Sequence, residues 1–323
     1  MFSRLLVVLS GDGQADQVLL ARAALMRRAD SQLCLWRPVR SPLGGLDYRF
    51  LTPELRQQVR HRSLATARAG LEELAASLRA EGWPVHCALS WLEKDAAASL
   101  HETACQQQAS LILMRRDAGA LSSDLRHFLR LENLRLAQQA CLWLIDTGNP
   151  LPPRRLIAAL DTGAEGTGCA AAERLTRHAA ALALRLSMPL ELLTVVPQLS
   201  WLGEFGDLTH AQDDVLATHS QRLEALRHLA AEQGSGVPPE AHLCEGDAGP
   251  ALVTWMSDLQ RAGHNRVMLM MGCSQVAGGL SSFWRSTVPE KVIARVGGDV
   301  CILPVQTPAA DDDRDIAGLP QSE

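Results

Sequence analysis

The sequence repeats itself at an interval of about 150 residues, which is the size of a whole domain and too long for one unit of a solenoid. Three segments of the first half recur in the same order in the second half. They are RLLVVLSGD at 4–12 with RLIAALDTG at 155–163, ASLILMRR at 109–116 with NRVMLMMG at 265–272, and ACLWLID at 140–146 with DVCILPV at 299–305. The chain is therefore predicted to be a tandem duplication.

Each copy alternates short apolar strands with helices. Near-continuous apolar runs such as Leu5–Leu9 and Leu156–Leu160 indicate strands that are buried on both faces. The other expected strands are Leu33–Val39, Val85–Trp91, Leu111–Met114, Cys141–Ile145, Leu190–Val196, Ala241–Cys244, Val267–Met271 and Val300–Leu303, and the expected helices are Gln17–Arg28, Thr52–Glu81, Ala96–Gln107, Ala170–Leu186, Asp213–Glu232 and Pro250–Arg261. The pattern predicts an α/β fold of two tandem doubly wound domains, each a five-stranded parallel sheet with helices on both faces.

A proline-rich segment marks the boundary between the copies. GNPLPPR at 148–154 is prone to turns and stiffened by its prolines, so it predicts a linker. It separates a first domain, residues 1–147, from a second domain, residues 155–306. The tail 307–323 is acidic and low in hydrophobicity, which predicts disorder.

The charge balance and the lengths of the apolar segments argue against two classes of partner. A net charge of −5 and a pI of about 6.1 give no broad basic surface, so no nucleic acid is expected as a partner. The apolar run Leu5–Leu9 is too short for a secretory signal, and no segment reaches the length of a membrane span. We therefore expect a cytoplasmic protein without a membrane partner.

The cysteines show neither a metal-binding nor a disulfide pattern. The sequence holds 8 cysteines without a CxxC motif, and its 10 histidines form no HExxH motif. All but Cys273 fall in expected strands or helices or, for Cys169, directly before one, so we expect reduced thiols that are buried as small apolar side chains. Cys273 is expected in a loop beside Gly272, where a nearby helix N-terminus would favour redox reactivity.

Ligand chemistry is expected where the first and fourth strands of each copy end. Doubly wound sheets bind ligands beyond the carboxyl ends of their strands, at the point where the strand order reverses. In the second copy these ends are Asp161 and the segment MGCSQVAGGLSSFWRSTVPEKVI at 271–293. Glycines let backbone N–H groups approach phosphate oxygens, and a helix N-terminus favours an anion. The segment therefore predicts a phosphate-binding loop.

This segment resembles the nucleotide loop of the universal stress protein family. The family pattern is Gly, two residues, Gly, nine residues, Gly and then Ser or Thr, followed by a Val and a helix like Glu-Lys-Val. ALDTG at 159–163 resembles the family's first-strand end with its Asp, and EGDAGPA at 245–251 resembles its GDP-type turn. The resemblance extends over both copies, about residues 3–306. It implies sheets of strand order 3-2-1-4-5 and, in many members, pairing of the fifth strands of two domains.

The resemblance also implies a binding site in the second copy. ATP-binding members hold adenine near the Asp and a Val of the second strand, and phosphates on the glycine loop. The positions that match are Asp161, Val195, Met271, Gly272, Gly279, Ser286, Thr287 and Val288. The implied ligand is ATP or a related nucleotide, and the one metal implied is a Mg²⁺ bound with the nucleotide.

The loop departs from the family pattern in two ways. Gln275 stands where the second glycine belongs, so its side chain would obstruct the γ-phosphate side or replace a backbone contact with its amide. Placing Ser286 at the last glycine and Thr287 at the hydroxyl requires one extra loop residue but preserves Val288. Counting without a gap puts Arg285 and Ser286 at these two positions instead. We prefer the first alignment, and a vestigial loop that binds nothing is the alternative.

The first copy departs further from the family. Ser10 replaces the Asp, Arg116 replaces the first loop glycine, and no Gly-Ser or Gly-Thr step opens the following helix. The arginines of this segment, Arg115, Arg116, Arg126 and Arg130, indicate either an anion site made of guanidinium groups or a solvated helix face. We expect the first copy to serve structure, dimer-like pairing or a different ligand.

The motifs favour a binding protein over an enzyme. No recognisable set of nucleophile, base and orienting residue is visible, and no Walker lysine follows the glycines. Together with the resemblance, this predicts a non-enzymatic cytosolic stress-response protein, an intramolecular pseudo-dimer of two domains that binds ATP through the second. The alternatives are a slow ATPase or ATP-gated switch, and a scaffold that binds another small metabolite or a protein partner without nucleotide.

Overall fold

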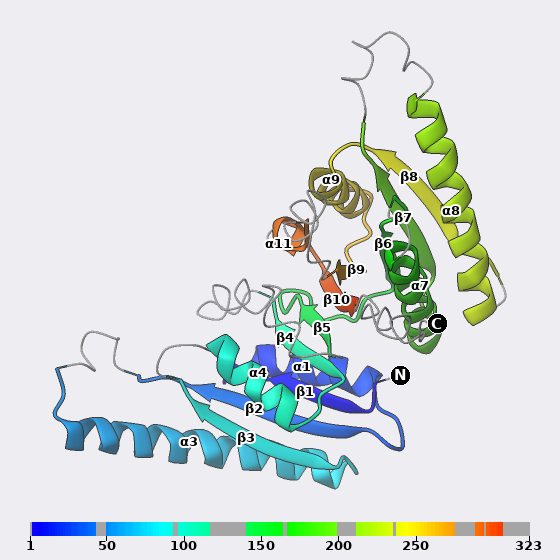
Figure 1. Ribbon diagram of the computed structural model, residues 1–323. Coiled ribbons are helices and arrows are strands. Elements are labelled where there is room, and N and C mark those ends of the chain that lie inside the picture. The colour runs from blue at the N-terminus through cyan, green and yellow to red at the C-terminus, as the bar shows by residue number, and fades with distance from the viewer. Residues whose placement is uncertain are drawn as a thin grey trace, which may run out of the picture.

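The strands of both copies belong to one continuous sheet (Figure 1). The computed structural model describes residues 2–42, 50–92, 96–116, 140–163, 167–198, 211–234, 237–274, 288–293 and 295–305. Along the sheet the strand order is β3-β2-β1-β4-β5-β10-β9-β6-β7-β8. We call the part up to residue 146 the first lobe and the part from residue 155 the second lobe.

The first lobe has the expected parallel sheet of order 3-2-1-4-5. Because side chains alternate along a strand, Leu5 and Val7 share a buried cluster with α1 and α3, whereas Leu6 and Val8 share one with α4 on the opposite face. The strands are β1 (Arg4–Val8), β2 (Gln32–Val39), β3 (Val85–Trp91), β4 (Leu111–Arg115) and β5 (Cys141–Ile145), and the helices are α1 (Gly13–Leu25), α3 (Pro53–Ala80) and α4 (Ala96–Gln106).

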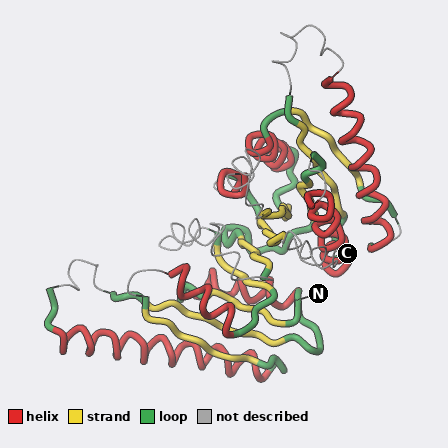
Figure 2. The backbone as a smooth tube through the Cα atoms, in the orientation of Figure 1, coloured by secondary structure: helices red, strands yellow, loops and turns green. Residues whose placement is uncertain are grey.

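The second lobe repeats this arrangement. Its buried clusters place α7 and α8 on one face of the sheet and α9 and α11 on the other, and Figure 2 shows helices on both sides of the strands in each lobe. The strands are β6 (Arg155–Leu160), β7 (Leu190–Val196), β8 (Glu240–Glu245), β9 (Val267–Ser274) and β10 (Asp299–Val305), and the helices are α7 (Thr167–Leu186), α8 (Ala211–Gln233), α9 (Ala248–Arg261) and α11 (Val288–Ile293).

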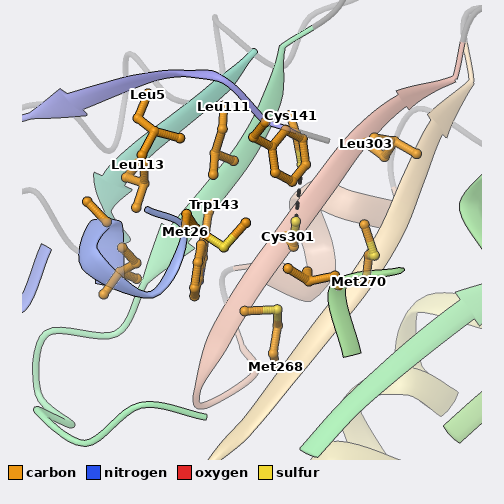
Figure 3. Close-up of a cluster of buried hydrophobic side chains, with 14 of the residues drawn as sticks. Leu5, Met26, Leu111, Leu113, Cys141, Trp143, Met268, Met270, Cys301 and Leu303 are labelled. Atoms are coloured by element: carbon orange, nitrogen blue, oxygen red, sulfur yellow. Dashed lines mark hydrogen bonds between the residues drawn. The ribbon is translucent and has the colours of Figure 1, made fainter. Parts of the chain in front are cut away.

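The two lobes join through their last strands, a contact that we call the seam. β5 and β10 run antiparallel, with Trp143 opposite Cys301 and Leu142 opposite Ile302. Buried side chains of both lobes, including Trp143, Met270 and Cys301, form one apolar cluster across the seam (Figure 3). The apolar edge that each lobe would otherwise expose is therefore paired, which removes an aggregation hazard.

Three strands, β3, β5 and β7, have the predicted bounds, and the other predicted elements are shifted by a few residues at one or both ends. Two of these differences have a clear physical cause. Helix α1 begins at Gly13 rather than at Gln17, because Asp12 has an extended backbone and its carbonyl accepts the N–H of Asp16 at 2.8 Å. Strand β9 runs to Ser274 rather than to Met271, because β10 provides pairing partners that far. None of the helices in the described ranges combines the length and the apolar character that a membrane span requires.

Candidate functional site

Four of the predicted site residues meet at one edge of the second lobe. Strands β7, β6 and β9 are parallel neighbours, so their carboxyl ends lie side by side. Ala159 pairs with Met271, and Leu160 pairs with Thr194, the residue before Val195. Asp161 directly follows β6, and Gly272 directly follows Met271. The edge of the sheet therefore brings Asp161, Val195, Met271 and Gly272 into one neighbourhood.

The apolar members of this group face α9 and α11. Met271 is buried in the cluster that also contains Leu252 of α9 and Val292 of α11. Val195 and Val288 are partly buried against the same cluster. These side chains form an apolar surface on one face of the strand ends.

Asp161 adds a carboxylate at the end of the neighbouring strand β6. Its side chain is exposed to solvent, and Oδ1 accepts the backbone N–H of Gly163 at 3.1 Å. This short turn fixes the carboxylate at the end of β6.

The structure corrects the expectation for Gly272 and Cys273. Both were expected in a loop that leaves the sheet, but both have strand backbone within β9. Gly272 pairs with Leu303, and Cys273 pairs with Pro304. The longer partner strand β10 explains the difference, because it extends the parallel ladder beyond Met271.

The other predicted positions fall outside the described residues. Gly279, Ser286 and Thr287 lie in the stretch 275–287, as does Gln275. The preferred loop alignment therefore stays a prediction. Val288, the next site residue, begins helix α11.

A buried chain of hydrogen bonds begins at the residue after Asp161 and was not predicted from the sequence. The Thr194 hydroxyl donates to the carbonyl of Leu160 at 3.0 Å. The hydroxyl oxygens of Thr162 and Thr194 are 2.8 Å apart, and Thr162 Oγ1 is 2.6 Å from Nδ1 of His219. All three side chains of the Thr162–Thr194–His219 chain are buried.

Counting protons assigns the donors in this chain. Since the single hydroxyl proton of Thr194 goes to Leu160, Thr162 must donate to Thr194. Thr162 then offers only a lone pair to His219, so Nδ1 of His219 is the donor. Nε2 of the neutral ring is therefore an acceptor. This nitrogen lies close to Gly163, since a Cβ built on that glycine would be only 3.4 Å away from it.

The surroundings of His219 favour its neutral form. Burial lowers its pKa below the ordinary value of 6.5, Asp161 acts in the opposite direction, and the charge of Arg222 lowers it further. The ring can therefore accept a hydrogen bond but brings no positive charge at pH 7. The sequence carried a signal: His219 is spaced with Leu223 and Leu226, which are buried on the same face of α8.

A pocket of about 350 Å³ lies between α7 and α8, beside Asp161. Ala172 and Leu226 lie at its floor. Positive side chains, Arg177 and Arg222, line it together with negative ones such as Asp161. Such a volume lies near the lower end of small-molecule pockets, which measure roughly 300–1,000 Å³. Among the described residues, no group of three or more His, Cys, Asp or Glu side chains is placed to hold a metal ion.

The second lobe is similar in sequence to a known protein family. Residues 154–304 match the profile of the universal stress protein family. The second lobe is thus a universal stress protein domain. No curated protein matches the chain.

Solved structures extend the likeness to both lobes at the level of fold. A protein of unknown function from Pseudomonas aeruginosa PAO1 is 20% identical, with a TM-score of 0.65 over 94% of this chain and 93% of that one. A putative universal stress protein from Pseudomonas aeruginosa UCBPP-PA14 is 19% identical, with a TM-score of 0.65 and coverage of 94% and 93%. A universal stress protein from Archaeoglobus fulgidus is 13% identical, with a TM-score of 0.59 and coverage of 94% and 98%.

The first lobe differs from the universal stress protein domain at the corresponding strand end. Its counterpart of Asp161 is Ser10, whose N–H donates to the Asp16 carboxylate at 2.8 Å. The N–H of Gly11 donates to the same carboxylate at 2.9 Å. A carboxylate of the lobe itself thus uses the backbone donors that an anionic ligand would need.

Arg116 forms contacts between the two lobes, so both expectations for it, an anion site and a solvated helix face, are wrong. Its Nη1 donates to the carbonyls of Val296 at 2.6 Å and Gly298 at 2.7 Å, both in the second lobe. Its Nη2 forms an ion pair with Asp146 at 3.4 Å. The guanidinium is therefore neither a solvated group nor an anion site. Arg115 pairs with Asp12 at 3.2 Å, while Arg126 and Arg130 lie outside the described residues.

Proposed function

We propose that the chain is a non-enzymatic stress-response protein that binds an adenine nucleotide through its second lobe. The proposal extends to the whole chain: a two-domain universal stress protein of the type of universal stress protein E, with domains at 1–147 and 155–306 joined by the linker 148–154. The observation that carries it is the convergence of Asp161, Val195 and Met271 at the ends of three neighbouring strands in a universal stress protein domain.

The chemistry of these side chains suits a purine nucleoside. Val195, Met271 and Val288 offer an apolar surface to the base, and Asp161 offers hydrogen-bond acceptors at the end of the neighbouring strand β6. The phosphates would be held by backbone N–H groups after Gly272 and by the hydroxyl of Thr287, with Mg²⁺ on the phosphates. A carboxylate at one end and neutral donors at the other would place the charged part of the ligand away from Asp161.

The donor directions support binding rather than catalysis. Thr162 and His219 form a hydroxyl–imidazole contact that resembles a nucleophile with its base. A base would have to accept the hydroxyl proton, but here the imidazole donates and the proton of Thr162 goes to Thr194. The contact is therefore not arranged to activate Thr162. A slow ATPase or an ATP-gated switch remains the rival function. ADP formation during incubation with ATP would distinguish the ATPase from a protein that only binds ATP.

Calorimetry with ATP tests the proposal. We expect wild-type protein to bind ATP, and Gly272→Asp to abolish binding because it adds a carboxylate near the phosphates. Gly13→Asp is the matched control, since it adds the same charge to the first lobe at a site where a Cβ meets no atom within 4 Å. Absence of wild-type binding at millimolar ATP would refute the proposal.

The pocket between α7 and α8 supports a second candidate, a scaffold that binds another small metabolite. Its apolar floor and charges of both signs suit a small zwitterionic molecule. Mass spectrometry of small molecules released from the purified protein separates the candidates, because a nucleotide and a zwitterionic metabolite differ in mass and phosphorus content.

We also propose that the two lobes act as an intramolecular pseudo-dimer. The antiparallel pairing of β5 and β10 supports this, because it occupies in one chain the edges through which two separate domains would pair. Separately expressed lobes should then associate in solution, and lobes that stay monomeric in sedimentation would contradict the idea.

A further inference from the structure

Two thiols from different lobes meet at the seam. Cys141 lies on β5 and Cys301 on β10, and their side chains are 0% and 1% exposed. Their sulfur atoms are 3.1 Å apart, as the dashed line in Figure 3 shows. The seam pairs Cys301 with Trp143, so Cys141 is its diagonal neighbour on the same face.

This contact differs from that of an isolated buried thiol. A disulfide bond is about 2.05 Å long, so the two sulfurs need to approach by only about 1 Å to bond. Cys141 also donates to the carbonyl of Ile302 at 3.3 Å, which leaves Cys301 as the donor between the two sulfurs. Both side chains are thus held toward each other by the backbone of the seam.

We propose that Cys141 and Cys301 are a modification site, at which a peroxide forms a disulfide that covalently joins the two lobes. The proposal does not depend on nucleotide binding, because both residues lie in the seam and not at the strand ends of the candidate site.

The chemistry balances with hydrogen peroxide as the oxidant. One thiolate attacks a peroxide oxygen, the O–O bond breaks, and a sulfenic acid and hydroxide form; the hydroxide takes up the proton that this thiol released and becomes water. The second sulfur then attacks the sulfenic sulfur, the S–O bond breaks, and the hydroxide leaves as a second water with the remaining thiol proton. Two thiols are oxidised, one peroxide is reduced, and two waters are released.

The closed seam controls the rate of this reaction. The hydrogen bond with Cys301 and burial raise the pKa of Cys141 well above its ordinary value, so the reactive thiolate is scarce while the seam is closed. Transient opening hydrates the thiols and admits the oxidant. The disulfide therefore forms under conditions that both oxidise and loosen the protein, and it then holds the lobes together.

Peptide mapping of the full chain after peroxide treatment tests the proposal. We expect wild-type protein to lose two alkylatable thiols and to yield, without reductant, one peptide pair that links Cys141 to Cys301. Dithiothreitol should restore both thiols, and the melting temperature of the oxidised protein should exceed that of the reduced protein. Low urea concentrations should accelerate the reaction, because they favour opening.

Two variants separate this pair from the other thiols. Cys301→Ala should abolish the link, whereas Cys34→Ala, which changes a buried thiol in the sheet of the first lobe, should leave it intact. If Cys301→Ala does not fold, the map of the wild-type chain decides alone. Full alkylation of wild-type thiols after peroxide, or linkage through other cysteines only, would overturn the proposal.

Discussion

Arg22 of the first lobe donates from Nε to the Asp299 carboxylate of the second lobe at 3.1 Å, and the two side chains are 1% and 4% exposed. The same carboxylate accepts Nε1–H of Trp143 and the backbone N–H of Asp146, both at 3.0 Å. The other guanidinium nitrogens of Arg22 donate to carbonyls of the linker, among them that of Pro150. We call this buried network the lobe clasp.

Breaking the lobe clasp should strongly destabilise the protein. Arg22→Met leaves the Asp299 charge buried without its ion-pair partner, and such changes cost about 3–5 kcal/mol in the free energy of unfolding. Arg177→Met is the control, since it removes an exposed pair with Glu173 that is worth less than about 1 kcal/mol. Urea unfolding measures both, and a loss below about 1 kcal/mol for Arg22→Met would show that the clasp contributes little.

Gly298 should not tolerate a side chain. Its φ is +87°, and a Cβ would lie 2.4 Å from the carbonyl oxygen of Val267. Gly298→Ala should therefore lower the free energy of unfolding by about 1–3 kcal/mol. Gly13→Ala, in a helix and in open space, should be neutral or slightly stabilising. Equal melting temperatures of the two variants would contradict this account.

Acidification should destabilise the second lobe through His219. Its pKa is lower in the folded protein than the unfolded value near 6.5, so the folded state binds fewer protons in this range. The unfolding free energy should therefore fall as the pH drops from 6.5 toward the folded pKa. In His219→Gln this part of the pH dependence should disappear, and an unchanged profile in urea titrations would exclude His219 as its source.

The hydroxyl at position 287 should matter to phosphates and not to the nucleoside. If Thr287 donates to a phosphate, Thr287→Ala should weaken ATP binding about ten- to a hundred-fold, the effect of losing a charge-assisted hydrogen bond. Adenosine affinity should stay the same, and Ser10→Ala in the first lobe should change neither. Calorimetry with both ligands measures this, and an equal loss for adenosine would contradict a phosphate contact.

The strands could be predicted from the sequence because each is a short apolar run in a sheet covered on both faces. Val85–Trp91 and Cys141–Ile145 needed no tertiary information for their bounds. The end of β9 did need it, since Gly272 joins the sheet only because Leu303 lies opposite. A glycine followed by polar residues otherwise predicts a loop.

The polar contacts of the site could not be predicted, because their partners are distant in sequence. Thr162 and His219 are 57 positions apart, and no local motif connects them. Arg116 was expected to bind an anion or to be solvated. This was wrong because its acceptors, Val296 and Gly298, lie in the other lobe. The pairing of β5 with β10 brings Arg116 close to these acceptors.

Because both lobes belong to one chain, their contacts at the seam need not be symmetric. The repeat aligns Ala140 with Asp299, so the acid that receives Arg22 exists in one half only. Likewise Val300 stands where the first half has Cys141, and Leu142 where the second half has Cys301. Identical subunits that met through their last strands would have to make every contact twice. Within one chain, a single mutation can instead change the contacts that one lobe makes at the seam and leave the residues of the other lobe unchanged.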